Sequence, residues 1–177
     1  VEEVLPPGFD AVHALELWGS IYFAEIGAAE SEAVERAQAI ELGLSPESNE
    51  PILRGAAAGV NASLRRYAAM IDERDHIAFA WERFFDDWDV LICPPSPFTA
   101  PEHSEKGPPI VIDGEATPYG VSLDAYTMPF NLTGHPGIVL PLGITDGGSP
   151  FGYQVVTRRW DDARLLSIAQ TLAQVTG

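Results

Sequence analysis

Length, composition and charge limit what this protein can be. The chain has 177 residues, of which 46% are hydrophobic, and this composition is typical of a folded domain rather than of a disordered segment. Its formal net charge is −16 and it carries only 10 Lys and Arg residues, so no nucleic-acid partner is expected, because phosphate backbones would be repelled. The single cysteine, Cys93, excludes a disulfide within the chain and a cysteine-rich metal site.

The start of the chain and its apolar runs bear on where the protein resides. The sequence begins VEEVLPPGFD, without an initiator Met, and we interpret it as a fragment or a processed piece of a longer protein. It contains neither a basic-then-apolar signal peptide nor an apolar run near the roughly 18 residues of a membrane span. We therefore expect no membrane contact and a cytoplasmic location.

The first half of the chain is predicted to be helical. Apolar side chains recur at three- and four-residue spacings over residues 11–30, a weaker helical pattern begins at residue 31, and residues 51–88 form a long helix interrupted around 55–59. One face of the long helix is expected on a core, and its stripe comprises Leu64, Tyr67, Ala68, Ile71, Ala78, Trp81, Phe85 and Trp88.

Short strands are predicted in the second half. DVLICP (89–94) is an unbroken apolar run, typical of a strand buried on both faces. IVIDGEATP (110–118) resembles a hairpin with Asp113 and Gly114 at its turn. GIVLPLGIT (137–145) and FGYQVVT (151–157) are predicted to be two strands joined by the Gly-rich turn DGGSP.

Two further helices complete the expected fold. Residues 121–134 form a short helix that ends at Gly134, with Pro136 as a stop. Residues 161–177 form an amphipathic helix with Asp161 as N-cap, and its core-facing residues are Leu165, Ile168, Ala169, Leu172 and Val175. Helices that alternate with apolar strands predict an α/β fold, taken as one segment, 1–177.

Composition and spacing alone reveal no active site. There is no Gly-x-Ser-x-Gly elbow beside any histidine, so we interpret the four histidines as structural or surface residues: His13, His76, His103 and His135. Cys93, in the run VLICP, is interpreted as a buried small residue rather than a nucleophile. No ligand spacing predicts a metal, and no cofactor is expected.

Three ordered motifs carry a family resemblance. They are ERFFDDWDVLICPPSPFTAP, LDAYTMPFNLTGHPGIVLPLG and SPFGYQVVTRRWDDARLLSIAQTL, which together cover roughly residues 80–173. In this order the motifs resemble the C-terminal part of amidase signature enzymes. The resemblance implies an α/β fold, with a mixed β-sheet flanked by α-helices. It also makes FNLTGHPG a corner between a helix and a strand, with Gly134 releasing the helix.

The family's chemistry, as the resemblance implies, is hydrolysis of a carboxylic amide by a Ser–cis-Ser–Lys triad through an acyl-enzyme. That triad lies in the family's N-terminal half. Here Lys106 is the only lysine, and the sequence contains no Ser-Ser pair. We therefore assign no catalytic residue in this chain and expect it to be inactive by itself.

One site residue is implied by the resemblance. Asp124 matches an Asp that helps to bind the amide substrate in the A subunits of amidotransferases, and its carboxylate could hold a substrate amino group. That Asp124 only caps or decorates the short helix stays equally open. Thr127, on the same turn, is a weaker substrate-binding candidate. The Pro-rich loop 95–108 and the segment before PFNLTG are expected to edge the substrate cleft.

The sequence is thus identified as the C-terminal portion of an amidase, providing sheet scaffold and cleft wall. Its expected partners are the N-terminal catalytic half of the same enzyme and a small-molecule amide, and self-association stays open. Two alternatives remain: a non-catalytic acidic α/β interaction module, and a fragment like the A subunit of an amidotransferase.

Overall fold

The computed structural model describes residues 1–29, 44–48, 50–100, 109–117 and 125–176. These residues form two compact units, Val1–Ala80 and Trp81–Gly177, and each unit is described by itself. The single segment expected from the sequence stays a prediction. The weaker helix expected from residue 31 falls on 30–43, outside the described residues.

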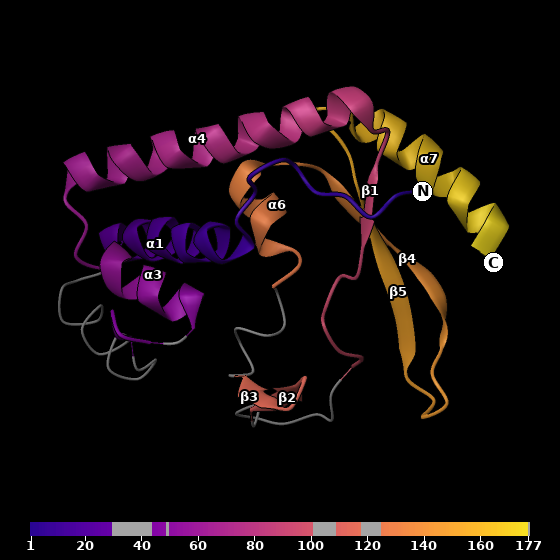
Figure 1. Cartoon of the computed structure of the whole chain (residues 1–177), viewed down its shortest axis with the longest axis horizontal. Helices are drawn as coiled ribbons and strands as arrows, with labels where there is room; N and C mark the ends of the chain where they lie inside the picture. The colour runs from indigo at the N-terminus through magenta and orange to yellow at the C-terminus, as the bar shows by residue number, and fades with distance from the viewer. Residues whose placement is uncertain (30–43, 49, 101–108, 118–124, 177) are drawn as a thin grey trace. The chain divides into compact units, whose positions relative to one another are not determined.

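Two helices of the first unit pack backbone against backbone. Helix α1 spans Ala11–Ala29, helix α3 spans Pro51–Gly59, and the two lie side by side (Figure 1). A Cβ atom added at Gly55 would lie 1.9 Å from the carbonyl oxygen of Glu16. The close approach of α1 and α3 therefore requires glycine at this position, because any other residue would collide with the backbone of α1.

This packing corrects the predicted interruption around residues 55–59. Gly55 and Gly59 both lie inside α3, and the break falls at residues 60–63, before helix α4 (Leu64–Asp87). The Ser63 hydroxyl accepts a hydrogen bond from the Arg66 N–H at 3.2 Å, as an N-cap does. The glycines allow a close helix contact rather than ending the helix.

Helix α4 confirms part of the predicted apolar stripe. Ala78, Trp81 and Phe85 are buried, whereas Leu64 and Ala68 near the start of the helix are exposed. The other predicted residues are half-buried: Tyr67, Ile71 and Trp88. The helix begins in the first unit and ends in the second. Its last two turns carry the side chains that contact the segment FNLTGHPG, among them Trp81 and Glu82.

The second unit contains a three-stranded antiparallel sheet in the order β1-β5-β4 (Figure 1). The strands are β1 (Leu91–Cys93), β4 (Gly137–Ile144) and β5 (Pro150–Val156). The predicted hairpin of β4 and β5 is confirmed, with a register shift between Pro141 and Gly143.

Helix α7 (Asp162–Thr176) covers one face of this sheet. Leu165 and Ala169 of α7 pack on alternate strand residues, because every second side chain of a strand points to the same face. The buried core of this unit comprises Leu140, Tyr153, Val155, Leu165 and Ala169, and the partly buried Val90, Ile138 and Leu172 pack against it. The helix begins directly after Asp161, whose carbonyl accepts the Leu165 N–H at 2.9 Å. Val175 does not face the core as predicted: it is 80% exposed, because α7 extends past the strands.

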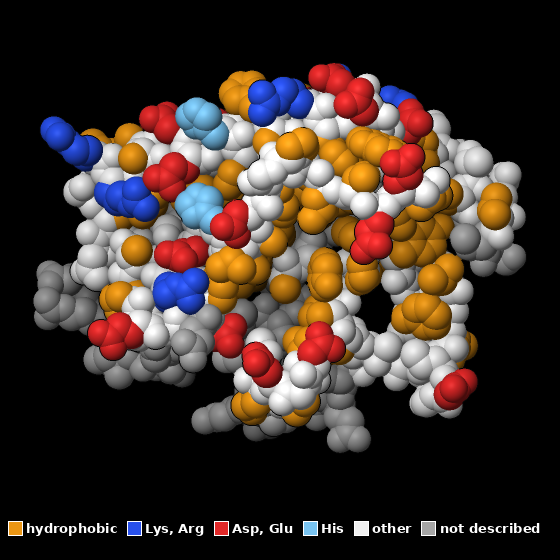
Figure 2. Space-filling view, in the orientation of Figure 1, with side chains coloured by type: hydrophobic (Ala, Val, Ile, Leu, Met, Phe, Trp, Pro, Cys, Tyr) orange, Lys and Arg blue, Asp and Glu red, His pale blue; other side chains and the backbone are white. Residues whose placement is uncertain are grey.

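Strand β1 is less buried than its sequence predicted. Ile92 is 46% exposed, and Leu91 and Cys93 are half-buried. The run DVLICP was expected to be buried on both faces, but among the described strands β1 pairs only with β5 and lies at an edge. Hydrophobic side chains reach the surface over this sheet (Figure 2), and they include Ile92, Val139, Leu142 and Ile144.

The second predicted hairpin is also confirmed. Strand β2 (Ile110–Ile112) pairs antiparallel with β3 (Glu115–Thr117). Asp113 and Gly114 both have positive φ, 51° and 88°, as a two-residue hairpin turn requires. The fold class is therefore α/β as predicted, and the described strand pairs are all antiparallel. Within the part of the chain that the structure describes, no helix is long and apolar enough to cross a membrane.

Candidate functional site

The segment FNLTGHPG forms a corner, as the sequence predicted. Helix α6 (Met128–Thr133) ends at Gly134, which adopts the left-handed conformation with φ 73°. The N–H groups of Gly134 and His135 both donate to the Phe130 carbonyl, at 2.8 and 3.2 Å. The chain then turns into β4, two residues further on.

Aromatic rings hold this corner against the end of α4. Trp81 is 1% exposed, and its ring centroid lies 5.2 Å from that of Phe130, with the planes near perpendicular. Phe85 packs on the His135 ring at a centroid distance of 5.6 Å. The edge-to-face contact of Trp81 with Phe130 adds to the free energy gained by burying these rings.

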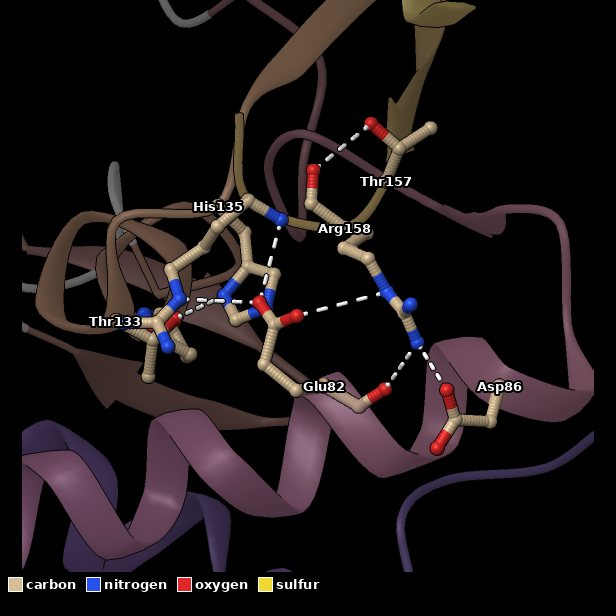
Figure 3. A network of polar contacts seen from close by, with 8 residues as sticks. Glu82, Asp86, Thr133, His135, Thr157 and Arg158 are labelled. Carbon is tan, nitrogen blue, oxygen red and sulfur yellow. Dashed lines mark hydrogen bonds and ion pairs between the residues drawn. The ribbon is translucent and has the colours of Figure 1, made fainter. Parts of the chain in front are cut away.

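A polar network centred on Glu82 ties three segments together (Figure 3). The Glu82 Oε1 atom accepts a hydrogen bond from Arg159 Nε at 3.0 Å and lies 3.2 Å from His135 Nε2. Arg158 lies 3.5 Å from the other carboxylate oxygen, donates to the Glu82 carbonyl at 2.9 Å and pairs with Asp86. The network joins α4, the corner and the loop that follows β5.

The His135 ring is neutral in this setting. Burial lowers its pKa to about 4, with Arg159 also lowering it and Glu82 opposing the shift. The Thr133 hydroxyl donates to the Pro129 carbonyl at 2.8 Å, and its oxygen also lies 2.8 Å from His135 Nδ1 in a second hydrogen bond. The Nε2 atom has no aligned hydrogen bond, despite its closeness to Glu82.

Thr133, His135 and Glu82 together have the residue types of a nucleophile, a base and an orienting acid. Their geometry does not permit that chemistry. The His135 side chain is 0% exposed, Thr133 is buried, and the Thr133 proton is already donated to a carbonyl. A nucleophile must reach a substrate carbon, so we assign this cluster a structural role in holding the corner.

A second polar contact holds the turn in front of α6. Gln154 of β5 donates from Nε2 to the Tyr126 carbonyl at 3.2 Å and to the Cys93 sulfur at 3.3 Å. Thr127 follows as the N-cap residue of α6, and its carbonyl accepts the Phe130 and Asn131 N–H groups at 3.1 and 3.0 Å. The Tyr126–Thr127 turn is thereby fixed to the sheet.

Of the two predicted substrate-binding residues, the structure describes Thr127 but not Asp124. Thr127 is half-buried on this turn, and its side chain does not cap α6. Asp124 lies outside the described residues, as do His103 and Lys106. The roles of Asp124 and Thr127 in substrate binding stay predictions.

The remaining candidates show no sign of catalysis. His13 and His76 are exposed, and His76 Nδ1 lies 2.7 Å from the Asp72 carbonyl oxygen within its own helix. Cys93 is half-buried, and burial raises the pKa of its thiol, which disfavours the nucleophilic thiolate. Within the described ranges, no three His, Cys, Asp or Glu residues group as metal ligands.

Sequence reasoning did not find Glu82, Arg159 or Gln154 as side chains that hold the site. Glu82 and Arg159 are 77 positions apart, and Gln154 is 28 positions from Tyr126. Of these three residues, only Gln154 could have been recognised from the sequence, through its position in a strand. A polar amide between Tyr153 and Val155 is unusual in an otherwise apolar strand and indicates a specific partner.

The chain belongs to the amidase signature family. The family model described as amidase matches residues 1–166. A similar sequence is the A subunit of the glutamyl-tRNA(Gln) amidotransferase of Oleidesulfovibrio alaskensis, 34% identical over 140 residues, which are 76% of this chain and 27% of that protein. Another is the 6-aminohexanoate-cyclic-dimer hydrolase of Paenarthrobacter ureafaciens, 34% identical over 116 residues, 61% of this chain and 23% of that protein.

Solved structures confirm the fold. A crystal structure of an amidase aligns with a TM-score of 0.70 at 22% identity, covering 93% of this chain and 36% of that one. A structure of 6-aminohexanoate cyclic dimer hydrolase aligns with a TM-score of 0.68 at 25% identity, covering 99% of this chain and 37% of that one. The chain therefore matches part of the amidase-signature fold and spans about a quarter of the curated relatives' length.

Proposed function

We propose that this chain is the C-terminal portion of an amidase that cleaves a carboxylic amide to an acid and ammonia or an amine. One observation supports this most: the chain belongs to a family of amide hydrolases, yet its only lysine is Lys106 and it has no Ser-Ser pair. The Ser–cis-Ser–Lys chemistry then resides in an N-terminal half, which is the partner of this chain.

The contribution of this chain is scaffold and cleft wall. The β1-β5-β4 sheet with α7 provides a rigid layer, and the corner at Gly134 sets where α6 begins and ends. We propose that the turn before α6 lines the cleft, where Asp124 holds an amino group of the substrate and Thr127 lies beside it. A carboxylate binds such a group through charge-assisted hydrogen bonds.

The test compares two proteins on one simple amide, such as benzamide. The chain joined to its upstream coding region should release ammonia, and a serine-directed sulfonyl fluoride should abolish this activity. The 177-residue chain alone should show no turnover. Hydrolysis by the chain alone that survives both the inhibitor and each Ser→Ala change would contradict the proposed mechanism.

Two other functions have some support. The match to the A subunit of an amidotransferase favours a similar role here, and that role predicts turnover that depends on glutamyl-tRNA. The absence of a triad in the sequence favours a non-catalytic interaction module. A native mass equal to that of the 177-residue chain in cell extracts would support the module, and sedimentation of that species would show whether it self-associates.

A further inference from the structure

Gln154 is a buried polar side chain on the face of the sheet that α7 does not cover. Its neighbours Tyr153 and Val155 belong to the core under α7, and successive strand residues point to opposite faces. Gln154 is only 5% exposed, so its amide must find partners within the protein. In the sheet register it lies between Cys93 of β1 and Val139 of β4.

The amide nitrogen of Gln154 has two hydrogen-bond partners. Its Nε2 donates to the Tyr126 carbonyl at 3.2 Å and to the Cys93 sulfur at 3.3 Å. A backbone carbonyl can only accept a hydrogen bond, so the nitrogen and not the oxygen of the amide faces Tyr126. The interaction therefore depends on an N–H donor at this position, and a carboxylate could not replace it.

This hydrogen bond acts on the peptide unit that enters Thr127. The Tyr126 carbonyl and the Thr127 nitrogen share one planar peptide group, so fixing the carbonyl fixes the direction in which Thr127 begins α6. The Tyr126 side chain is 41% exposed and is a weak anchor by comparison. The turn is therefore held to the sheet through its main chain.

We propose that Gln154 is the positioning residue of the substrate-binding turn Tyr126–Thr127. This inference rests on the proposed function, in which that turn lines the amide-binding cleft. Gln154 does not touch the substrate: it holds the turn so that binding groups keep their place. Loss of the hydrogen bond from Gln154 to the Tyr126 carbonyl weakens substrate binding in the ground state and the transition state alike. KM therefore rises while kcat changes little.

The experiment uses the chain joined to its catalytic half and compares three variants. Gln154→Met keeps the length of the side chain but removes the donor, and Gln154→Glu places a carboxylate against the Tyr126 carbonyl. Gln170→Met makes the same exchange on the exposed face of α7 and is the matched control. We expect KM for the amide to rise roughly 3- to 10-fold in Gln154→Met, the value of one hydrogen bond, and further in Gln154→Glu. In Gln154→Met, kcat should stay within about 2-fold of wild type.

Hydrogen exchange of the peptide 125–133, followed by mass spectrometry, gives a readout that does not depend on activity. Exchange of the Phe130 and Asn131 amides, which bond to the Thr127 carbonyl, should be several-fold faster in Gln154→Met and unchanged in Gln170→Met. A higher KM without faster exchange, or faster exchange without a higher KM, overturns the positioning role. An inactive wild-type enzyme refutes the proposed function instead, and exchange still shows whether Gln154 holds the turn.

Discussion

The carboxylate of Glu82 joins the end of α4 to the loop after β5 through Arg159. Its Oε1 atom accepts hydrogen bonds from Arg159 Nε at 3.0 Å and from the Arg159 backbone N–H at 3.3 Å. The same atom lies 3.2 Å from His135 Nε2, so the carboxylate is close to both the loop and the corner. Glu82 is therefore the residue that the contacts of this polar network share.

Replacing Glu82 should therefore destabilise the protein. Glu82→Gln keeps the shape of the side chain but removes the charge that faces two arginines, and we expect a loss of about 1–3 kcal/mol in the free energy of unfolding. Asp86→Asn is the control, because Asp86 is exposed and, among the residues that the structure describes, pairs only with Arg158 at the surface. Urea titration of both variants measures the difference. Equal midpoints for the two would contradict the central role of Glu82.

Acid should destabilise the fold through His135. Its pKa is about 4 in the folded protein and about 6.5 in an unfolded chain, so between these values the unfolded state binds a proton that the folded state does not. Stability therefore falls as pH drops from 6.5 to 4, by about 2–3 kcal/mol from this residue. Unfolding midpoints measured across that range should show the slope. His135→Gln should flatten it, whereas His76→Gln, at an exposed site, should not.

Because α1 and α3 are in close contact, we expect one methyl group added at Gly55 to destabilise the protein severely. A Cβ at Gly55 would lie 1.9 Å from the Glu16 carbonyl oxygen, and a rigid backbone cannot move aside as a side chain can. We expect Gly55→Ala to cost about 3 kcal/mol of stability, despite the better helix propensity of Ala. Ala58→Leu, on the exposed face of the same helix, adds more atoms and should cost little. Thermal unfolding followed by circular dichroism distinguishes the two variants. A Gly55→Ala variant as stable as the wild type would show that α1 and α3 are not in close backbone contact.

Trp160 offers a stabilising change. Its φ is 65°, a conformation that disfavours any side chain, and the ring is 93% exposed, so little packing offsets the strain. Trp160→Gly should raise the free energy of unfolding by about 1 kcal/mol. Trp160→Ala removes the same ring but keeps a Cβ, so the free energy of unfolding should hardly change. If both variants gain equally, the backbone strain is not the cause.

Much of the local structure could be predicted from short stretches of sequence. Asp113–Gly114 indicated a hairpin because its turn needs positive φ at both positions, and Gly134 indicated the helix end for the same backbone reason. The order of three motifs identified the family, and the missing Ser-Ser pair predicts that the triad is not within these residues. These features depend on neighbours along the chain, which the sequence displays directly.

The tertiary structure decided what the same residue types do once they are packed. The sequence predicts a helix interruption at Gly55 and Gly59, which instead form the contact surface of α3. It also predicts a strand buried on both faces for DVLICP, but Ile92 of this strand is 46% exposed. The partners of His135 and of the Tyr126 carbonyl could not be predicted, since Glu82 and Gln154 are distant in sequence. Sequence alone determined the family and the corner at Gly134. Packing determined that His135 is a buried neutral ring and that Gln154 holds the turn, because burial and partner choice arise only when remote segments meet.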